Sequence, residues 1–160
     1  MSVAEDVQAL LQQANAPFTV IDHAYANTSE STAIARGTPL HWGAKALVFK
    51  LGKAPNFGIF VINAHRTVNS RAIRQRLDLR RLRFATKDEL LQLTGLTPGC
   101  VPPFGRPLFD LPLYVDAALP KEKNIAFSIG SHTQSVTVLC QDYLRAANPV
   151  DIFSFAESPS

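Results

Sequence analysis

The chain has 160 residues, of which 46% are hydrophobic and 18% charged, and its net charge is +3. That length is usual for one globular domain with one core. The longest apolar stretches, such as 44–51 and 59–62, are far too short to cross a bilayer. The first ten residues lack the basic and apolar regions of a secretory signal. The two cysteines make no disulfide framework, which favours a reducing compartment, so we expect a cytoplasmic protein.

The first part of the chain predicts alternating helices and strands. Ser2 and Glu5 form a capping box, and Thr28 can cap a helix that Gly37 ends. Segments rich in Val, Ile, Leu and Phe predict strands. The expected elements are a helix at 2–13, a strand at 18–21, a helix at 29–36, and strands at 44–51 and 57–63.

The second part predicts further short elements around one long loop. Residues 97–112 hold five prolines and two glycines, so this stretch is expected to be irregular. The tail after Asn148 is expected to be loose. The expected elements are a basic helix at about 69–77, a strand at 82–85, a helix from Thr86 to Gly95, strands at 113–115, 125–129 and 136–139, and a helix at 142–147.

This order of elements differs from the regular alternation of a doubly wound fold. It predicts an α+β fold, with a curved, mixed, barrel-like β-sheet flanked by helices. We expect a single domain over residues 1–160, with its core at about 16–147 and a loose tail at 148–160.

The histidines give little support for a metal site. His23, His41, His65 and His132 lack the spacing of zinc ligands, and no dinucleotide-binding or P-loop motif is present. We therefore expect no metal and no cofactor. His132 lies in a Gly-Ser-His-Thr turn, where it can line a pocket.

Lys45 is a candidate for chemistry. Strand alternation places it on the same face as Leu47 and Phe49, and a lysine there costs free energy unless it meets an anion or water. One interpretation is a side chain that extends past the strand end into solvent. The other is a cation held at a cleft to bind a phosphate or an ester oxygen.

The loop Gly99-Cys-Val-Pro-Pro103-Phe-Gly105 is a second candidate. Proline stiffens the backbone, and glycine allows a sharp turn or a close approach to a ligand. The loop is either a rigid connection or a support for backbone N–H groups that bind a carbonyl oxygen. Within it, we interpret Cys100 as a small buried residue, since no base partner for a nucleophile is identifiable.

A basic segment lies at residues 66–83, with seven arginines and one acidic residue. The segment is either a solvated helix face or a contact surface for phosphates, to which Arg71, Arg74 and Arg81 belong.

Taken together, these segments resemble the YbaK / prolyl-tRNA-synthetase-associated (ProX-like) editing family over about residues 16–147. Five segments carry the resemblance in the family's order: Thr28-Ser-Glu-Ser-Thr-Ala33, Gly43-Ala-Lys45-Ala-Leu-Val-Phe49, Arg83-Phe-Ala-Thr-Lys-Asp-Glu-Leu90 with Leu93-Thr-Gly95, the 99–105 loop, and Asn124-Ile-Ala-Phe-Ser-Ile-Gly130.

The resemblance implies a deacylase that hydrolyses the ester bond of mischarged tRNA. It implies that Lys45 contacts the 3′-terminal nucleotide, that the 99–105 loop binds the aminoacyl carbonyl and positions a water, and that Gly130 borders the side-chain pocket. The expected catalytic residues are Lys45, Gly99 and Pro103. The expected substrate-binding residues are Thr28, Cys100, Val101, Pro102, Phe104, Gly105, Gly130, Ser131 and His132.

The chain also departs from relatives within that family. Cys-tRNA deacylases carry an aspartate near the position of Ser135, and Ala-tRNA deacylases tend to carry a histidine at the position of Ser128. The substrate is therefore left as a small amino acid: Ala, Ser, Thr or Cys. A synthetase is a possible further partner, and no membrane partner is expected.

Two other functions remain open at this point. One is a non-catalytic tRNA- or synthetase-binding module that uses residues 66–83, with Arg71, Arg74 and Arg81 as the predicted tRNA-binding residues. The other is a regulatory binder of a small molecule that uses the same pocket.

Overall fold

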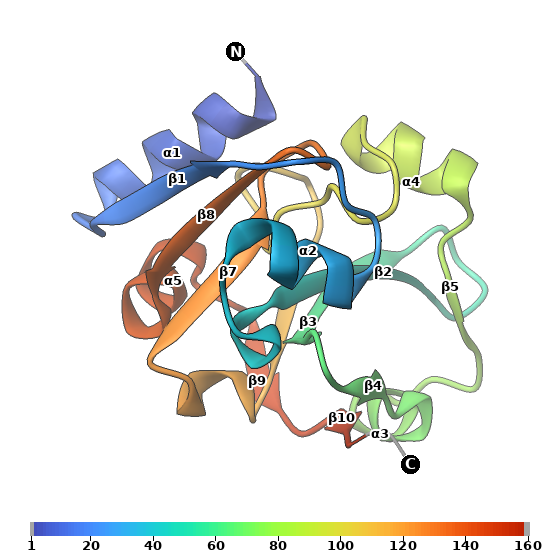
Figure 1. Ribbon diagram of the computed structural model, residues 1–160. Coiled ribbons are helices and arrows are strands. Elements are labelled where there is room, and N and C mark those ends of the chain that lie inside the picture. The colour runs from blue at the N-terminus through green and yellow to red at the C-terminus, as the bar shows by residue number, and fades with distance from the viewer. Residues whose placement is uncertain (1, 159–160) are drawn as a thin grey trace.

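The computed structural model describes residues 2–158, which form an α+β fold (Figure 1). In chain order the elements are α1 (Val3–Gln13), β1 (Phe18–Asp22), α2 (Ser29–Arg36), η1 (Leu40–Trp42), β2 (Ala44–Leu51), β3 (Phe57–Asn63), β4 (Thr67–Val68), α3 (Ser70–Arg76), β5 (Leu82–Phe84), α4 (Lys87–Thr94), β6 (Leu113–Asp116), η2 (Leu119–Lys121), β7 (Asn124–Ser128), β8 (Gln134–Leu139), α5 (Cys140–Ala147), β9 (Asp151–Phe153) and β10 (Ala156–Glu157).

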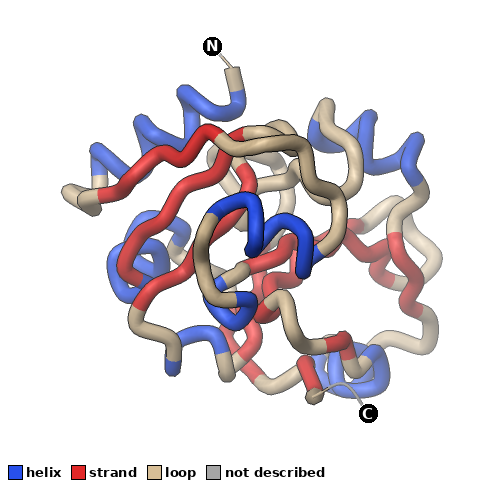
Figure 2. Tube along the Cα trace, viewed as in Figure 1, coloured by secondary structure: helices blue, strands red, loops and turns tan. Residues whose placement is uncertain are grey.

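The strands form three sheets, with orders β5-β2-β3-β6-β9, β1-β8-β7 and β10-β4. The largest sheet is mixed, because β2 pairs antiparallel with β3 and β5, whereas β3, β6 and β9 run parallel. A bridge between Gly43 and Ala126 links this sheet to the three-stranded one. Figure 2 shows the strands in the middle of the molecule and most helices around them. The predicted mixed, curved arrangement is therefore confirmed, although the strands of residues 2–158 do not close into a barrel.

Both faces of the central sheet are buried. Val48, Ile59 and Val61 belong to the larger core cluster, which lies between the two larger sheets. Phe60 and Ile62 point to the other face, in the cluster that contains Ile73 of α3. Because successive side chains of a strand point to opposite faces, one continuous apolar strand supplies both clusters.

The predicted capping residues of three helices are confirmed, whereas α5 begins at Cys140, two residues before its predicted start at residue 142. Capping boxes begin α1, α2 and α4, at Ser2, Thr28 and Thr86 respectively. Gly37 and Gly95 end α2 and α4 in the left-handed conformation, with φ angles of 72° and 75°. Within residues 2–158, no helix has the length and apolar character needed to cross a membrane.

The expectation of a loose tail after Asn148 is wrong for residues 149–158. Strand β9 pairs with β6, and β10 pairs with β4. The carboxylate of Asp116, which is 1% exposed, accepts hydrogen bonds of 2.8 Å from the N–H groups of Phe155 and Ala156. These contacts join residues 39 and 40 positions apart, so no local pattern predicts them. Residues 159 and 160 lie outside the described part of the chain.

Candidate functional site

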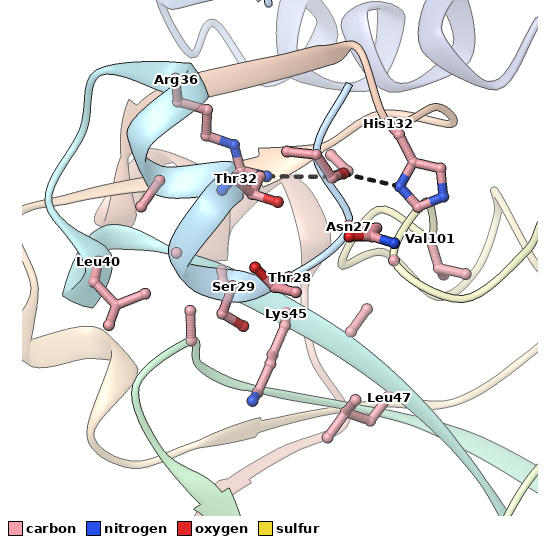
Figure 3. A pocket seen from close by; sticks show the side chains of 18 residues that line it. Asn27, Thr28, Ser29, Thr32, Arg36, Leu40, Lys45, Leu47, Val101 and His132 are labelled. Carbon is pink, nitrogen blue, oxygen red and sulfur yellow. Dashed lines mark hydrogen bonds between the residues drawn. The ribbon is translucent and has the colours of Figure 1, made fainter. Parts of the chain in front are cut away.

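A pocket of about 150 Å³ lies beside α2 (Figure 3). Its walls come from one face of α2 and the residues before it, from the start of β2, from the loop after α4, and from the end of β7 with the following turn. A cavity of about this volume holds a molecule the size of benzene. The pocket therefore suits a small chemical group.

Helix α2 presents its polar face to the pocket. Thr28 is its N-cap, and its side chain accepts a hydrogen bond from the N–H of Ser31. Ser29, Thr32 and Arg36 follow at helical spacing and all line the cavity. The N-terminal end of a helix carries a partial positive charge, so the first turn of α2 favours an anion in this pocket.

Lys45 lies in β2, opposite Ile62, and its side chain lines the same pocket. Burial lowers the pKa of its ammonium group, whereas the nearby carboxylate of Glu30 acts in the opposite direction. Within residues 2–158, the Lys45 ammonium makes no hydrogen bond or ion pair with another side chain. Such a partly desolvated cation is stabilised by an anionic ligand.

Gly99 and Val101 of the proline-rich loop form another wall. Gly99 has a φ of +87°, and a Cβ at this position would lie 3.1 Å from Cε1 of His132, so only glycine fits without a shift. The backbone N–H groups of Gly99 and Val101 make no backbone hydrogen bond within the described chain. No backbone carbonyl of the described chain therefore accepts a hydrogen bond from either group.

His132 faces Gly99 from the turn after β7. Its Nδ1 lies 3.2 Å from the carbonyl oxygen of Ala26, as Figure 3 marks, and its ring packs against Tyr25 with centroids 4.9 Å apart. Because a carbonyl oxygen only accepts, Nδ1 must be the protonated ring nitrogen in this contact. The contact fixes the imidazole as a wall of the pocket.

The rest of the 99–105 loop lies beneath the pocket, outside its lining. Cys100, Pro102, Pro103, Phe104 and Gly105 are all buried. The hydroxyl of Tyr143 donates to the carbonyl of Pro103, and the ring of Phe104 packs edge-on against that of Tyr143. These contacts hold the loop in place, and direct roles of these five residues toward substrate remain predictions.

Gly130 and Ser131 also lie outside the lining. The N–H of Gly130 donates to the carbonyl of Cys100 at 2.9 Å, which ties the end of β7 to the loop. The structure thus brings Thr28, Lys45, Gly99, Val101 and His132 together around one cavity, whereas the other predicted catalytic and substrate-binding residues are not part of its lining.

Arg36 is a pocket residue that the sequence reasoning missed. Its Nε donates to Oγ of Ser135 at 2.7 Å and its Nη2 donates to Oγ of Ser128 at 3.1 Å. Burial lowers the pKa of the guanidinium to about 10. The partners lie 92 and 99 positions away in the chain, but the helical spacing of Arg36 with Thr32 and Thr28 is a signal that could have identified it.

The pocket is positively charged. Its lining contains two cationic side chains, Arg36 and Lys45, and no carboxylate. Among residues 2–158, no three His, Cys, Asp or Glu side chains are grouped so that they could hold a metal ion. The arrangement can therefore attract phosphate and carbonyl oxygens from several sides.

A separate basic groove lies at the other end of β2. The groove is lined by Lys50, Gly52, Lys53, Ser70, Arg74, Arg80, Arg81, Leu82 and Arg83. Arg74 and Arg81 of the predicted tRNA-binding residues line it, whereas Arg71 is exposed on α3 outside the lining. One of its cations, Arg83, is already paired with Glu89 at 2.7 Å.

Known proteins match the sequence and the fold of this chain. The sequence model of the aminoacyl-tRNA editing domain family matches residues 23–146. The multifunctional Ser/Thr-tRNA deacylase ProXp-y of Escherichia coli (strain K12) is 34% identical over 145 residues, which cover 88% of this chain and 86% of that protein. The same protein from Escherichia coli O157:H7 matches equally well.

Two solved structures have the same fold. A candidate trans-editing enzyme for prolyl-tRNA synthetase superposes with a TM-score of 0.81 at 21% identity, over 99% of each chain. The hypothetical protein APE2540 superposes with a TM-score of 0.82 at 20% identity, over 94% of this chain and 99% of its own. By its sequence match, this chain belongs to the aminoacyl-tRNA editing domain family.

Proposed function

We propose that this chain is a trans-editing deacylase, which hydrolyses the ester bond between a small amino acid and the 3′ end of a mischarged tRNA. The observation that carries the proposal is the meeting of Lys45 and Gly99 at one small cavity. Of the expected amino acids, Ala, Ser, Thr and Cys, the name of the Escherichia coli relative favours Ser and Thr.

Lys45 and the first turn of α2 are suited to hold the terminal phosphate. An ammonium group and a helix N-terminus are both common partners of phosphate oxygens. Lys45 approaches from β2, while Thr28 and Ser29 approach from α2 (Figure 3). Together they would fix the end of the tRNA at the mouth of the cavity.

The N–H groups of Gly99 and Val101 are suited to the aminoacyl carbonyl. A water adds to the carbonyl carbon and loses its proton to solvent, and these donors stabilise the oxyanion that forms. The bond from the carbonyl carbon to the ribose oxygen then breaks, and the ribose oxygen takes up a proton. Because the ester is already activated, positioning and electrostatic stabilisation suffice without a Ser-His-Asp set.

The basic groove is suited to the phosphates further along the tRNA. Lys45 and Lys50 lie on the same strand about 17 Å apart along it, and because five residues separate them their side chains point to opposite faces of the sheet. A chain of a few nucleotides can bridge such a distance. Arg74 and Arg81 would then contribute affinity rather than chemistry, in the cytoplasm or beside a synthetase that holds the same tRNA.

A panel of tRNAs charged with Ala, Ser, Thr or Cys tests the proposal. We expect at least one ester to be lost well above the rate in buffer, as followed by release of labelled amino acid. The basic groove also fits a second candidate function, a non-catalytic tRNA-binding module. Salt-sensitive binding of tRNA without release of any amino acid would favour that module and refute the deacylase.

A further inference from the structure

Arg36 enters the pocket from the last turn of α2 with hydrogen-bonding capacity to spare. A guanidinium has five N–H donors. Two of them are used, by Oγ of Ser135 and by Oγ of Ser128, and Figure 3 marks the second of these bonds. Within residues 2–158, Nη1 of Arg36 donates to no side chain or backbone atom. Donors therefore remain for a ligand in the cavity.

A buried chain of hydrogen bonds fixes the orientation of this guanidinium. Ser135 is fully buried, and its Oγ also lies 2.8 Å from Nε2 of His23. Nδ1 of His23 lies 2.9 Å from the carbonyl oxygen of Ala24, so Nδ1 carries the proton and Nε2 accepts from the Ser135 hydroxyl. Oγ of Ser135 is then left to accept from Arg36, and the guanidinium is oriented before any ligand arrives.

The place of Arg36 separates it from the phosphate end of the pocket. Thr28 and Arg36 bracket α2, and eight residues of a helix rise about 12 Å. Lys45 lies by the first turn of the helix, and Arg36 lies at its last turn (Figure 3). If Lys45 holds the terminal phosphate, Arg36 lies where the far end of the aminoacyl group would be.

No carboxylate is present among the lining residues, so the remaining donors of Arg36 are left to bind an acceptor atom of a ligand. A partly buried donor without a partner is costly, so the pocket favours a ligand that brings an acceptor oxygen. The cavity of about 150 Å³ admits only a small group. A serine or threonine side chain is small and carries one such oxygen.

We propose that Arg36 determines amino-acid specificity by donating a hydrogen bond to the side-chain hydroxyl oxygen of a seryl or threonyl group. This inference rests on the proposed deacylase function and assigns the selectivity of that site to one residue. Ser128 and Ser135 are positioning residues that hold the guanidinium. A site built to bind a hydroxyl rejects an analogue of the same shape that lacks it, because the buried donor is left without a partner.

The test uses pairs of aminoacyl groups that differ only in that oxygen. The same tRNA is charged separately with four amino acids, which form two pairs. Serine is paired with 2-aminobutyrate, and threonine is paired with valine. For the unmodified protein we expect kcat/KM to be at least about tenfold higher for the member with the hydroxyl. Equal values within both pairs, with clear hydrolysis of each ester, would overturn the assignment of Arg36 and leave the deacylase function standing.

Arg36→Met then locates the effect. This variant keeps the length of the side chain and removes the donors, so the ratio of kcat/KM values within each pair should fall toward unity, because the esters with the hydroxyl lose more than their analogues. Arg76→Met removes an exposed guanidinium on α3 and should retain the preference. An equal fall for all four esters in a folded Arg36→Met variant would mean that Arg36 supports the pocket without reading the side chain, and would overturn the proposal.

The remaining outcomes are also assigned. If Arg36→Met does not fold, as judged by circular dichroism, equal hydrolysis within both pairs by the unmodified protein would still overturn the proposal, and an unchanged preference in Ser135→Ala would count against it. Ser135→Ala keeps the guanidinium but removes one of its supports, and it should reduce the preference without abolishing hydrolysis. Loss of no ester in any pair would instead refute the deacylase function itself, which separates the two failures.

Discussion

The two ends of strand β2 present two different cationic surfaces. At its start, Lys45 lies in a small cavity with Arg36, where burial lowers the pKa of both groups. Toward its end, Lys50 lies in the basic groove with exposed arginines such as Arg80 and Arg81. The cavity has two cationic side chains that are partly buried, and the groove has several that are exposed to solvent.

This difference separates chemistry from affinity. Charges interact more strongly where water is excluded, so the cavity cations can act on individual oxygen atoms of a substrate. Exposed charges are screened by salt, so the groove cations contribute a diffuse attraction to a polyanion. Substitutions at the two ends of the strand should therefore change different quantities.

The largest effect is expected at the cavity end. Lys45→Ala removes the cation assigned to the terminal phosphate, and we expect kcat/KM for the best mischarged tRNA to fall about 100-fold. Single-turnover deacylation measures this change. Lys123→Ala removes an exposed lysine away from both surfaces and serves as the matched control. Full activity in Lys45→Ala would refute the role of that lysine.

The same lysine predicts a pH dependence. Because burial lowers its pKa, Lys45 loses its charge at a lower pH than a free lysine, whose pKa is about 10.4. Activity, corrected for spontaneous ester hydrolysis, should therefore decline on the alkaline side before that pH is reached. In Lys45→Arg the decline should move to higher pH, since arginine stays protonated throughout this range.

A smaller effect is expected at Gly99. In Gly99→Ala the new Cβ lies 3.1 Å from Cε1 of His132 and sits at a φ of +87°, so we expect about tenfold lower kcat/KM and a loss of stability of about 1–2 kcal/mol. Gly95→Ala has a similar φ of +75° but nothing within 4 Å of the new Cβ. That control should lose similar stability in thermal unfolding and retain activity, and equal activity losses in both would point to strain alone.

At the groove end we expect a change in binding rather than in chemistry. Arg74→Gln combined with Arg81→Gln should reduce the slope of log affinity against log salt by about 0.7–0.9 for each phosphate contact removed. Hydrolysis of a minimal aminoacyl ester of adenosine should stay unchanged. Arg106→Gln is a control with an exposed arginine elsewhere. An unchanged salt slope would exclude these two arginines from the tRNA surface.

The smallest effect is expected at Glu89. Arg83 and the N-cap Thr86 hold the pKa of its carboxyl at about 2, so Glu89 stays charged and keeps Arg83 paired at all but strongly acidic pH. Glu89→Gln preserves the capping box but removes the negative charge. Arg83 is then released into the groove, and tRNA affinity should rise about twofold at low salt. A fall in affinity would show that the pair itself is needed for binding.

Much of this fold follows from local patterns in the sequence. Capping residues such as Thr28 and Gly37 identify the ends of α2, and the apolar runs identify β2 and β3. The positions of Lys45 and Gly99 at one cavity followed from a family resemblance, since no local rule relates residues so far apart. Sequence patterns describe an element well when its signals lie within that element.

What could not be predicted depends on distant contacts. The helical spacing of Arg36 with Thr28 and Thr32 could have placed it on the pocket side of α2, but nothing in the sequence around it identifies the hydroxyl groups of β7 and β8 that orient its guanidinium. The strands β9 and β10 have three and two residues, too few to show an alternating pattern. The orientation of Arg36 and the two last strands both depend on residues that are distant in the sequence and become neighbours only in the folded protein.

Because the carboxylate of Asp116 binds the last strands, a mutation that truncates the chain before them should destabilise the fold. This carboxylate binds the amide groups of Phe155 and Ala156 from inside the core, and Phe155 fills the space beside Phe60. A nonsense mutation at one of codons 149–154 would therefore expose an apolar cavity and leave a buried anion short of donors, even though the residues that line the pocket, which end at His132, are all translated. We expect the product of such an allele to be removed by cellular proteases before it meets a tRNA.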